Sequence, residues 1–304
     1  MKTSFAIFAI LLISGLYAQQ DPQYTQYMYN TINVNPAYAG SRGVMSIFAL
    51  HRTQWAGLDG APVTNTISVN TPVAQRGIGL GLSVVNDRIG ISDENNIAID
   101  LSYSIKASAT YKLSFGIKAG ANLLSVDFSR LTLMPGDSPI VSDDNIKNQF
   151  KPTMGAGMYL HSEDSYAGLS IPNFLETNYY QHSTTSVASE KMHWFLIMGH
   201  VFEISSSMRL KPALLTKISS GAPLQIDLSA NVLVHDKFSA GAAYRSSAAW
   251  SLMAGFQIDH SWYIGYAYDT ENTKLANYNS GSHELFLRYE LFSVTDKIVS
   301  PRFF

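Results

Sequence analysis

The 304-residue chain combines 46% hydrophobic residues with only 14% charged residues, a formal net charge of −2 and no cysteine. Soluble domains usually carry about 25% charged residues. The low and nearly balanced charge excludes a polybasic nucleic-acid binder and a highly charged disordered tail. The lack of cysteine excludes disulfides, a lipid-attachment cysteine and any thiolate metal site or nucleophile.

The N-terminus has the order of a secretory signal peptide. Lys2 supplies an early positive charge, an apolar run follows from Phe5 to Leu16, and the small residue Ala18 precedes Gln19. This pattern predicts a signal peptide over residues 1–18 with cleavage after Ala18. The rest of the chain has no run of roughly 18 consecutive apolar residues, which argues against a membrane-spanning helix.

The next segment, residues 19–42, is rich in Gln, Asn and Tyr, with tyrosines at Tyr24, Tyr27, Tyr29 and Tyr38. A phenol ring offers contact area with a polar tip, so the segment suits a plug or a docking surface. The alternative is a mobile periplasmic leader, and composition does not separate these interpretations.

From residue 43 to residue 304 the chain reads as strands rather than helices. Runs of about ten residues alternate apolar with small or polar residues, which is the period of a strand with two different faces. In one run, Ile78, Leu80 and Leu82 are interleaved with glycines. About fourteen such strands follow one another, the first near Val44 to Arg52 and the last near Glu284 to Phe292.

The lengths of the connections distinguish a membrane barrel from a soluble sandwich. If the first strand runs outward, the connections after even-numbered strands are short: Pro72 to Arg76, Ala107 to Thr110, Ser162 to Ser165, Ser205 to Ser207, His235 to Lys237 and Asp259 to Ser261. Those after odd-numbered strands include the longest: Asp127 to Phe150, Pro172 to Glu190 and Thr270 to Ser282. This asymmetry predicts an all-β transmembrane antiparallel barrel in the outer membrane, with short periplasmic turns and long extracellular loops.

A barrel also assigns a place to the aromatic and charged residues. We expect an aromatic girdle at strand ends, formed by Trp194, Trp250, Trp262, Tyr263, Tyr289 and Phe292. Charges of both signs fall on the presumed inner face: Asp100, Lys106, Lys112, Lys118, Asp227, Arg245, Asp259, Asp269, Glu284, Arg288 and Glu290. Mixed sign argues against a strongly ion-selective pore and favours structural pairing.

No local pattern points to catalysis. The eight histidines are scattered without an H-E-x-x-H or zinc spacing, and no G-x-S-x-G elbow is present. The alternating glycines of residues 77–81 do not lead into a helix, so we interpret them as lumen-facing strand residues rather than a phosphate loop. We therefore expect no enzyme, no catalytic residue, no metal and no cofactor.

Several ordered motifs carry a resemblance to a known family. They are QDPQYTQYMYNTINVNPAYAGS after the signal peptide, RTQWAGLDGAPVT at residues 52–64, GLGLSVVNDRIG at 79–90, KPALLTKISSGAPLQIDL at 211–228, GSHELFLRY at 281–289, and the terminus SPRFF. Together they make the chain similar to the PorP/SprF family of the type IX secretion system, found in gliding and secreting Bacteroidota.

The resemblance implies an outer-membrane barrel without enzymatic activity that supports secretion and surface attachment of particular cargo, such as gliding adhesins. Its expected partners are the cargo C-terminal domain, outer-membrane lipid and, for some members, periplasmic ring or motor components; nucleic acid is not expected. The alternative function is a diffusion channel for small solutes, because a fourteen-stranded barrel can enclose a ligand-sized lumen.

The positions that match the family motifs are Asp21, Pro22, Gln23, Gln26, Tyr27, Asn35, Pro36, Ala37, Tyr38, Arg52, Trp55, Gly57, Ala61 and Pro62. Combined with the tyrosines of the leader, they give nine candidate partner-binding or plug residues: Tyr24, Gln26, Tyr27, Tyr29, Asn35, Pro36, Tyr38, Arg52 and Trp55. The terminal Phe303-Phe304 departs from an expected Tyr-Phe pair but keeps the aromatic character.

Overall fold

The computed structural model describes residues 22–73, 77–131, 145–175, 177–178, 189–190, 192–220 and 222–292. The predicted signal peptide and the SPRFF terminus lie outside these residues. No helix in the described part of the chain is long and apolar enough to cross a membrane.

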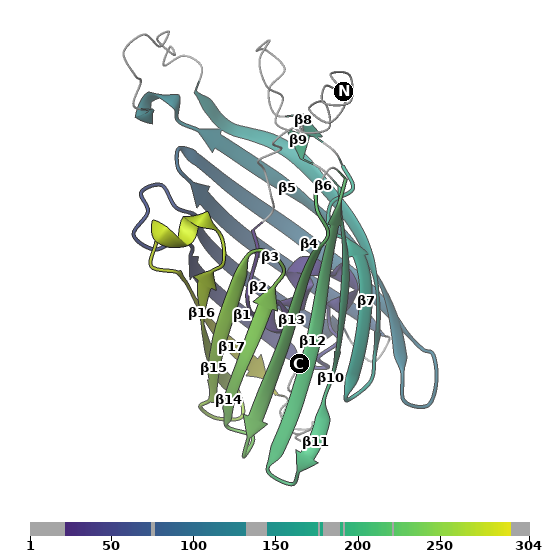
Figure 1. Cartoon of the computed structure of the whole chain (residues 1–304). Coiled ribbons are helices and arrows are strands. Elements are labelled where there is room, and N and C mark those ends of the chain that lie inside the picture. Colours follow the sequence, from purple (N-terminus) through teal and green to yellow (C-terminus); the bar gives the residue numbers. More distant parts are fainter. Residues whose placement is uncertain are drawn as a thin grey trace, which may run out of the picture.

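Strands make up nearly all of the regular structure (Figure 1). They are β1 (Met45–Thr53), β2 (Val63–Val73), β3 (Ile78–Ile89), β4 (Ser92–Lys106), β5 (Lys112–Val126), β6 (Ile146–His161), β7 (Ser165–Ile171), β8 (Thr177–Asn178), β9 (Ser189–Glu190), β10 (His193–His200), β11 (Phe202–Ser205), β12 (Met208–Ser219), β13 (Gln225–Val234), β14 (Phe238–Arg245), β15 (Ala249–Gln257), β16 (Trp262–Glu271) and β17 (Ser282–Leu291). The helical elements are short: η1 (Tyr27–Tyr29), α2 (Thr31–Val34), η2 (Pro36–Tyr38), η4 (Phe128–Arg130) and η6 (Lys274–Asn277).

The main sheet closes on itself. Neighbouring strands pair antiparallel in chain order, β1 pairs with β17, and β10 pairs directly with β12. β10 and β11 contact successive parts of β12 and together occupy one position in the wall, so fourteen strands surround the lumen. β8 and β9 form a separate two-stranded sheet. The predicted fourteen-stranded antiparallel barrel is confirmed.

The two ends of the barrel differ as the sequence predicts. Between strands, the short connections are exemplified by residues 107–111, 162–164 and 235–237, whereas residues 127–145 and 172–192 form long ones. The ends of β5 and β6 that flank one long connection, and β8 and β9 within the other, lie at one end of the barrel, at the top of Figure 1. In outer-membrane barrels this end is extracellular. One boundary is corrected: β6 begins at Ile146, inside the expected loop, because its first residues extend the ladder with β5 as far as Val126.

The wall has an apolar outer face and a polar inner face. Ile99 and Ile117 expose 58% and 60% of their surface on the outside, whereas their neighbour Asp100 is fully buried inside. Leu80 and Leu228, expected to face lipid, are also exposed at 41% and 52%. The outer face is therefore the apolar band that a bilayer requires.

Aromatic pairs lie near both ends of the wall. The rings of Tyr244 and Trp250 are 4.5 Å apart near the long-loop end, and those of Trp262 and Tyr289 are 4.5 Å apart near the short-turn end. Tyr263 is a correction to the predicted girdle, because it is buried inside the barrel. Side chains alternate along a strand, so Tyr263 and the adjacent Trp262 face opposite sides.

Most of the predicted inner-face charges are buried: Asp100, Lys118, Asp227, Arg245, Asp269, Glu284, Arg288 and Glu290. Lys106, Lys112 and Asp259 are exposed, because Lys106 ends β4 and Lys112 begins β5 at the short-turn rim, and Asp259 lies in a turn. The buried charges therefore line the inside of the barrel.

Candidate partner-binding site: the lumenal segment and the outer vestibule

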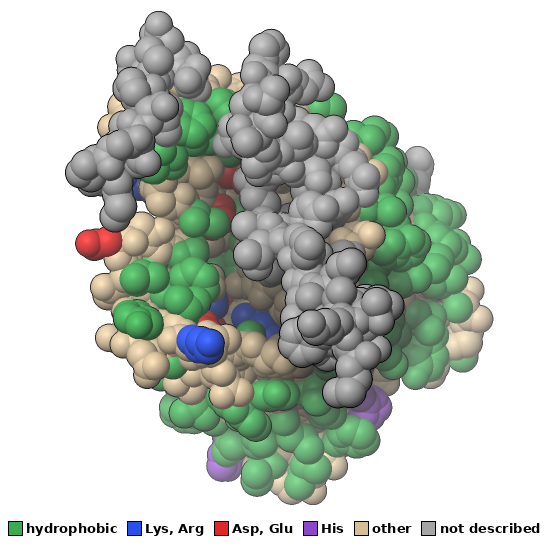
Figure 2. Space-filling model, turned by 45° about the horizontal axis from the view of Figure 1, so that its top comes forward, with side chains coloured by type: hydrophobic (Ala, Val, Ile, Leu, Met, Phe, Trp, Pro, Cys, Tyr) green, Lys and Arg blue, Asp and Glu red, His purple; other side chains and the backbone are tan. Residues whose placement is uncertain are grey.

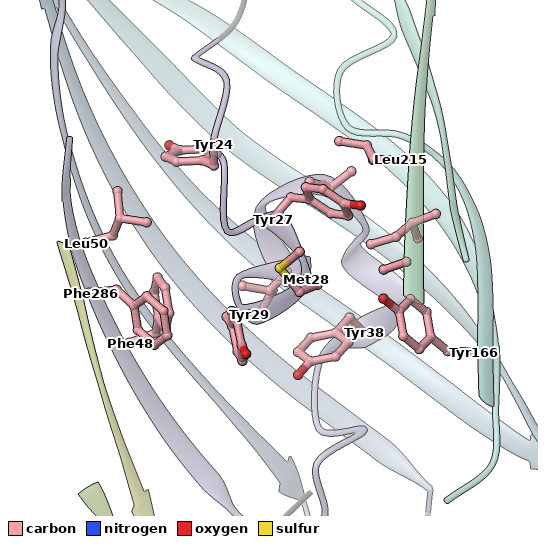
Figure 3. Close-up of a cluster of buried hydrophobic side chains, with 14 of the residues drawn as sticks. Tyr24, Tyr27, Met28, Tyr29, Tyr38, Phe48, Leu50, Tyr166, Leu215 and Phe286 are labelled. Atoms are coloured by element: carbon pink, nitrogen blue, oxygen red, sulfur yellow. The ribbon is translucent and has the colours of Figure 1, made fainter. Parts of the chain in front are cut away.

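Residues 22–44, here called the lumenal segment, lie inside the barrel (Figures 1 and 3). The segment runs the length of the lumen. Gln23 Nε2 donates to Gln225 Oε1 over 2.8 Å at the long-loop end, and Arg42 pairs with Glu290 near the short-turn end, where β1 begins. The segment thus passes through the barrel before the chain enters the wall.

Asn35 and Pro36 determine the last helical turn of the segment. Asn35 Oδ1 accepts the Ala37 N–H over 3.0 Å, which caps η2, and Pro36 occupies the first helical position. Asn35 Nδ2 donates to the Met158 carbonyl of β6 over 2.9 Å. Asn35 therefore forms the turn and fastens it to the wall with a single carboxamide.

Lumen-facing glycines let the segment approach the wall closely. A Cβ on Gly116 of β5 would lie 2.5 Å from the Ala37 Cα, and one on Gly157 of β6 would overlap the Asn35 carboxamide. Gly81, from the alternating run of residues 77–81, likewise faces Ile32 of the segment. This placement agrees with the interpretation of that run as lumen-facing strand.

Aromatic rings form the core between segment and wall (Figure 3). The Tyr29 ring lies 5.6 Å from Tyr263 and 5.0 Å from Phe286, and the Tyr38 ring packs edge-on against Tyr159 at 5.5 Å. The fully buried Lys211 places its Nζ 5.0 Å from the centroid of the Tyr29 ring.

A group of buried charges holds the start of the segment. The two Glu284 carboxylate oxygens accept the backbone N–H groups of Thr25 and Gln26, each over 2.9 Å. The Thr25 hydroxyl donates to Asp269 over 2.6 Å. Arg52 contacts both acids, at 2.8 Å from Asp269 and 3.2 Å from Glu284. Each buried charge has an opposite charge or hydrogen-bond donors, as desolvated ions require.

The tyrosine hydroxyls of the segment also find partners on the wall. Tyr24 bonds the Thr66 hydroxyl over 2.9 Å, and Tyr27 lies 3.3 Å from the Ser229 hydroxyl.

Trp55 stands apart from the other candidates. It lies in the connection between β1 and β2, with positive φ, and its indole N–H donates to Glu271 over 2.7 Å. Its backbone N–H donates to the Ser282 hydroxyl over 3.1 Å. Trp55 therefore ties together two extracellular connections and does not reach the lumenal core.

The other eight candidates, Tyr24, Gln26, Tyr27, Tyr29, Asn35, Pro36, Tyr38 and Arg52, are all buried within the barrel. Their contacts are with the wall, and a partner-binding role for them stays a prediction. Sequence reasoning named Asp269 and Glu284 as inner-face charges but did not connect them with the segment. It missed Tyr159, Tyr166 and Lys211. The alternation of side chains along their strands places all three on the inner face, and this alternation could have identified them.

A cavity of about 150 Å³ lies between the segment and the long-loop end of the wall; we call it the outer vestibule. Figure 2 shows a hollow with charged side chains at this end. The residues that line the cavity include Gln23, Tyr24, Tyr27, Asn33, Val34, Asp87, Glu94, Lys118, Asn122, Thr153, Phe195, Leu215, Lys217 and Asp227. Within the described residues, no group of three or more His, Asp or Glu side chains could hold a metal ion.

Comparison with protein families gives one match that covers most of the chain. The model of the family described as type IX secretion system membrane protein PorP/SprF matches residues 16–289. None of the curated proteins compared with the chain matches it.

Solved structures with a similar fold are outer-membrane barrels. The CymD monoaromatic hydrocarbon channel is 11% identical, with a TM-score of 0.50 over 89% of this chain and 94% of CymD. Omp33 of Acinetobacter baumannii is 10% identical, with a TM-score of 0.45 over 82% and 98%. The toluene transporter TodX of P. putida is 9% identical, with a TM-score of 0.45 over 86% and 93%. At 11% identity the likeness to CymD shows the fold alone.

Proposed function

Because the chain belongs to the PorP/SprF family of type IX secretion system membrane proteins, we propose that it supports the secretion and surface attachment of particular cargo proteins, such as gliding adhesins. The barrel selects its cargo by binding the cargo C-terminal domain. The barrel itself is exported with cleavage of the signal peptide after Ala18, and the protein is not an enzyme. The family match over residues 16–289 is the observation that carries this proposal.

The geometry supports a cargo contact at the long-loop end. The tyrosine rings of the lumenal segment are turned to the wall, so they offer a partner little surface. The extracellular connections and the outer vestibule do offer surface, with exposed side chains such as Tyr278 at 71% and Leu224 at 55%. Tyrosine is among the residues that most often anchor protein interfaces. Ring or motor components of the periplasm would meet the opposite, short-turn end.

A diffusion channel for small solutes is the competing function. It requires a continuous aqueous path, whereas the lumenal segment packs tightly against β5, β6, β16 and β17 across the lumen. The likeness to channels concerns the fold and transfers no substrate. The packing therefore favours a cargo-handling role over solute diffusion.

The deciding experiment compares the surface proteomes of a wild-type strain, a strain lacking this chain, and the same strain complemented with it. We expect one or a few large exported proteins to leave the surface in the deletion strain and to return on complementation. An unchanged surface proteome contradicts the proposal. Mass spectrometry of the barrel purified from the wild-type and complemented strains checks the expected N-terminus at Gln19.

A further inference from the structure

We propose that the outer vestibule binds an extended peptide segment, by accommodating an apolar side chain and hydrogen-bonding the adjacent peptide group. That the peptide comes from exported cargo rests on the proposed function, whereas the peptide chemistry rests on the cavity itself. The volume of about 150 Å³ is well above the roughly 10–15 Å³ that one water molecule needs.

The first observation is an incomplete set of hydrogen bonds in the cavity wall. Thr153 of β6 is 4% exposed, and its hydroxyl has no hydrogen-bond partner among the described residues. Both polar atoms of the Asn33 carboxamide also lack a hydrogen bond of normal geometry in the described part of the chain, although Tyr24 is nearby. Buried polar groups in folded proteins nearly always have a partner. Both residues line the cavity, and a side-chain rotation would bring their polar groups within reach of an incoming ligand.

The chemistry of these groups matches a peptide. A carboxamide presents a donor and an acceptor in one plane, and a peptide unit presents the complementary carbonyl and N–H. The Thr153 hydroxyl can donate or accept, so it adapts to either group. Asn122 and Gln23 add further amides to the same wall. The site is thus built for a ligand with both donors and acceptors.

The charged side chains that line the cavity are of both signs, with Asp87, Glu94 and Asp227 against Lys118 and Lys217, so the wall favours neither an anion nor a cation. Asp227 pairs with Arg245 at 2.8 Å and Lys118 with Asp100 at 3.5 Å, so these charges are already balanced by the barrel. Val34, Phe195 and Leu215 provide an apolar wall opposite the amides.

A sugar ligand is less suited to this wall. Sugars prefer the open face of an aromatic ring, but Tyr24 and Tyr27 are 8% and 1% exposed. An uncharged peptide with an apolar side chain fits the combination of amides and aliphatic surface.

The test uses the purified full-length barrel in detergent micelles with blocked amino acids as probes. N-acetyl-leucine amide, N-acetyl-glycine amide and glucose are compared by saturation-transfer NMR at equal concentrations. We expect the leucine derivative to bind with a dissociation constant in the millimolar range, the glycine derivative at least fivefold more weakly, and glucose not at all. Fragment-sized ligands have affinities of this order.

Variants locate the binding in the cavity. Thr153→Val removes the unpartnered hydroxyl and keeps the shape, and we expect it to weaken leucine-amide binding at least fivefold. Thr153→Ser keeps the hydroxyl and retains binding. Thr71→Val is the matched control, because Thr71 bonds the Pro72 carbonyl at the far end of β2. Heat-modifiable gel migration confirms that each variant is folded.

The outcomes separate this inference from the proposed function. If none of the peptide amides binds the folded barrel, or if glucose binds instead, the peptide site is wrong, whatever the surface proteome shows. Equal binding by the wild-type barrel and Thr153→Val overturns it as well. If the leucine derivative binds as expected but deletion of the chain leaves the surface proteome unchanged, the peptide site stands and the secretion role fails.

Discussion

At the scale of single residues, the buried Asn35 side chain makes two hydrogen bonds at once, one within its own turn and one to the barrel wall. Its oxygen caps η2 at the Ala37 N–H, while its nitrogen bonds the Met158 carbonyl on the wall. A serine in its place can still accept the Ala37 N–H but cannot reach β6. An alanine can do neither. The two contacts are therefore separable by substitution.

We predict that Asn35→Ser lowers the free energy of unfolding by about 0.5–1.5 kcal/mol, the usual net contribution of one hydrogen bond, because the bond to the Met158 carbonyl is lost. Asn35→Ala should cost about 1 kcal/mol more, because the cap is lost as well. Urea unfolding in micelles measures both. The exposed Asn277 gives a control, since Asn277→Ala should leave stability unchanged. Equal stability of the alanine variant and the wild type contradicts the double role.

Arg52 offers a second residue-scale prediction. Its guanidinium lies between Asp269 and Glu284, and all three side chains are at most 3% exposed. Arg52→Met leaves two buried carboxylates without their cation, which should cost about 3–5 kcal/mol. The matched control is Arg88→Met, whose ion pair with Asp93 is largely exposed and should contribute at most about 1 kcal/mol. A similar loss for both variants, again from urea unfolding, argues against a special role for the buried group.

At the scale of elements, the wall divides its interior into two kinds of surface. Strands β3, β5 and β6 present glycines to the lumenal segment, whereas β16 and β17 present the acids Asp269 and Glu284. One side admits the backbone of the segment, and the other side accepts its N–H and O–H groups. The segment is thus held by close packing against glycines on one side and by hydrogen bonds on the other. We call these two sets of contacts its seat.

Gly116→Leu tests the close packing of the segment against the wall. The new side chain would occupy the space of the Ala37 backbone, so the segment must shift, and we expect a loss of at least about 1–3 kcal/mol. Ala119→Leu is the control on the same strand, since Ala119 is exposed on the lipid face. A lower midpoint of heat-induced unfolding for Gly116→Leu alone supports the seat. An unchanged midpoint means that the segment does not need the close approach.

The elements also show what a sequence can predict. Period-two alternation located the strands, and the lengths of the connections oriented the barrel, because both are local properties. The placement of Tyr263 in a girdle was wrong, although alternation along the strand already puts adjacent residues such as Trp262 and Tyr263 on opposite faces. The path of the lumenal segment was not readable, because it depends on contacts such as Gln23 with Gln225, some two hundred residues apart. Composition left plug and leader equally open for this reason.

At the scale of the whole molecule, the orientation in the membrane follows from the two unlike ends. Because the chain has no native cysteine, a thiol reagent can label only a cysteine that is introduced by substitution. We expect Asn277→Cys, in the long connection before β17, to react with an impermeant thiol reagent on intact cells. Asp236→Cys, in the short turn after β13, should react only after the outer membrane is opened. Labelling of the second site alone on intact cells would reverse the assigned orientation.

The lumenal segment makes the barrel as a whole a poor pore, and conductance measures this directly. Wild-type protein in a planar bilayer should show no steady single-channel current, because the segment crosses the lumen and its ends are fastened to β13 and β17. Arg52→Met and Gly116→Leu weaken the two sides of its seat independently, so each should produce intermittent openings, and the double variant should stay open longer. Ala119→Leu should remain silent, because it changes only the lipid face. A wild-type barrel that conducts as steadily as the double variant would mean that the segment does not block the lumen, and solute diffusion would then become the better-supported function.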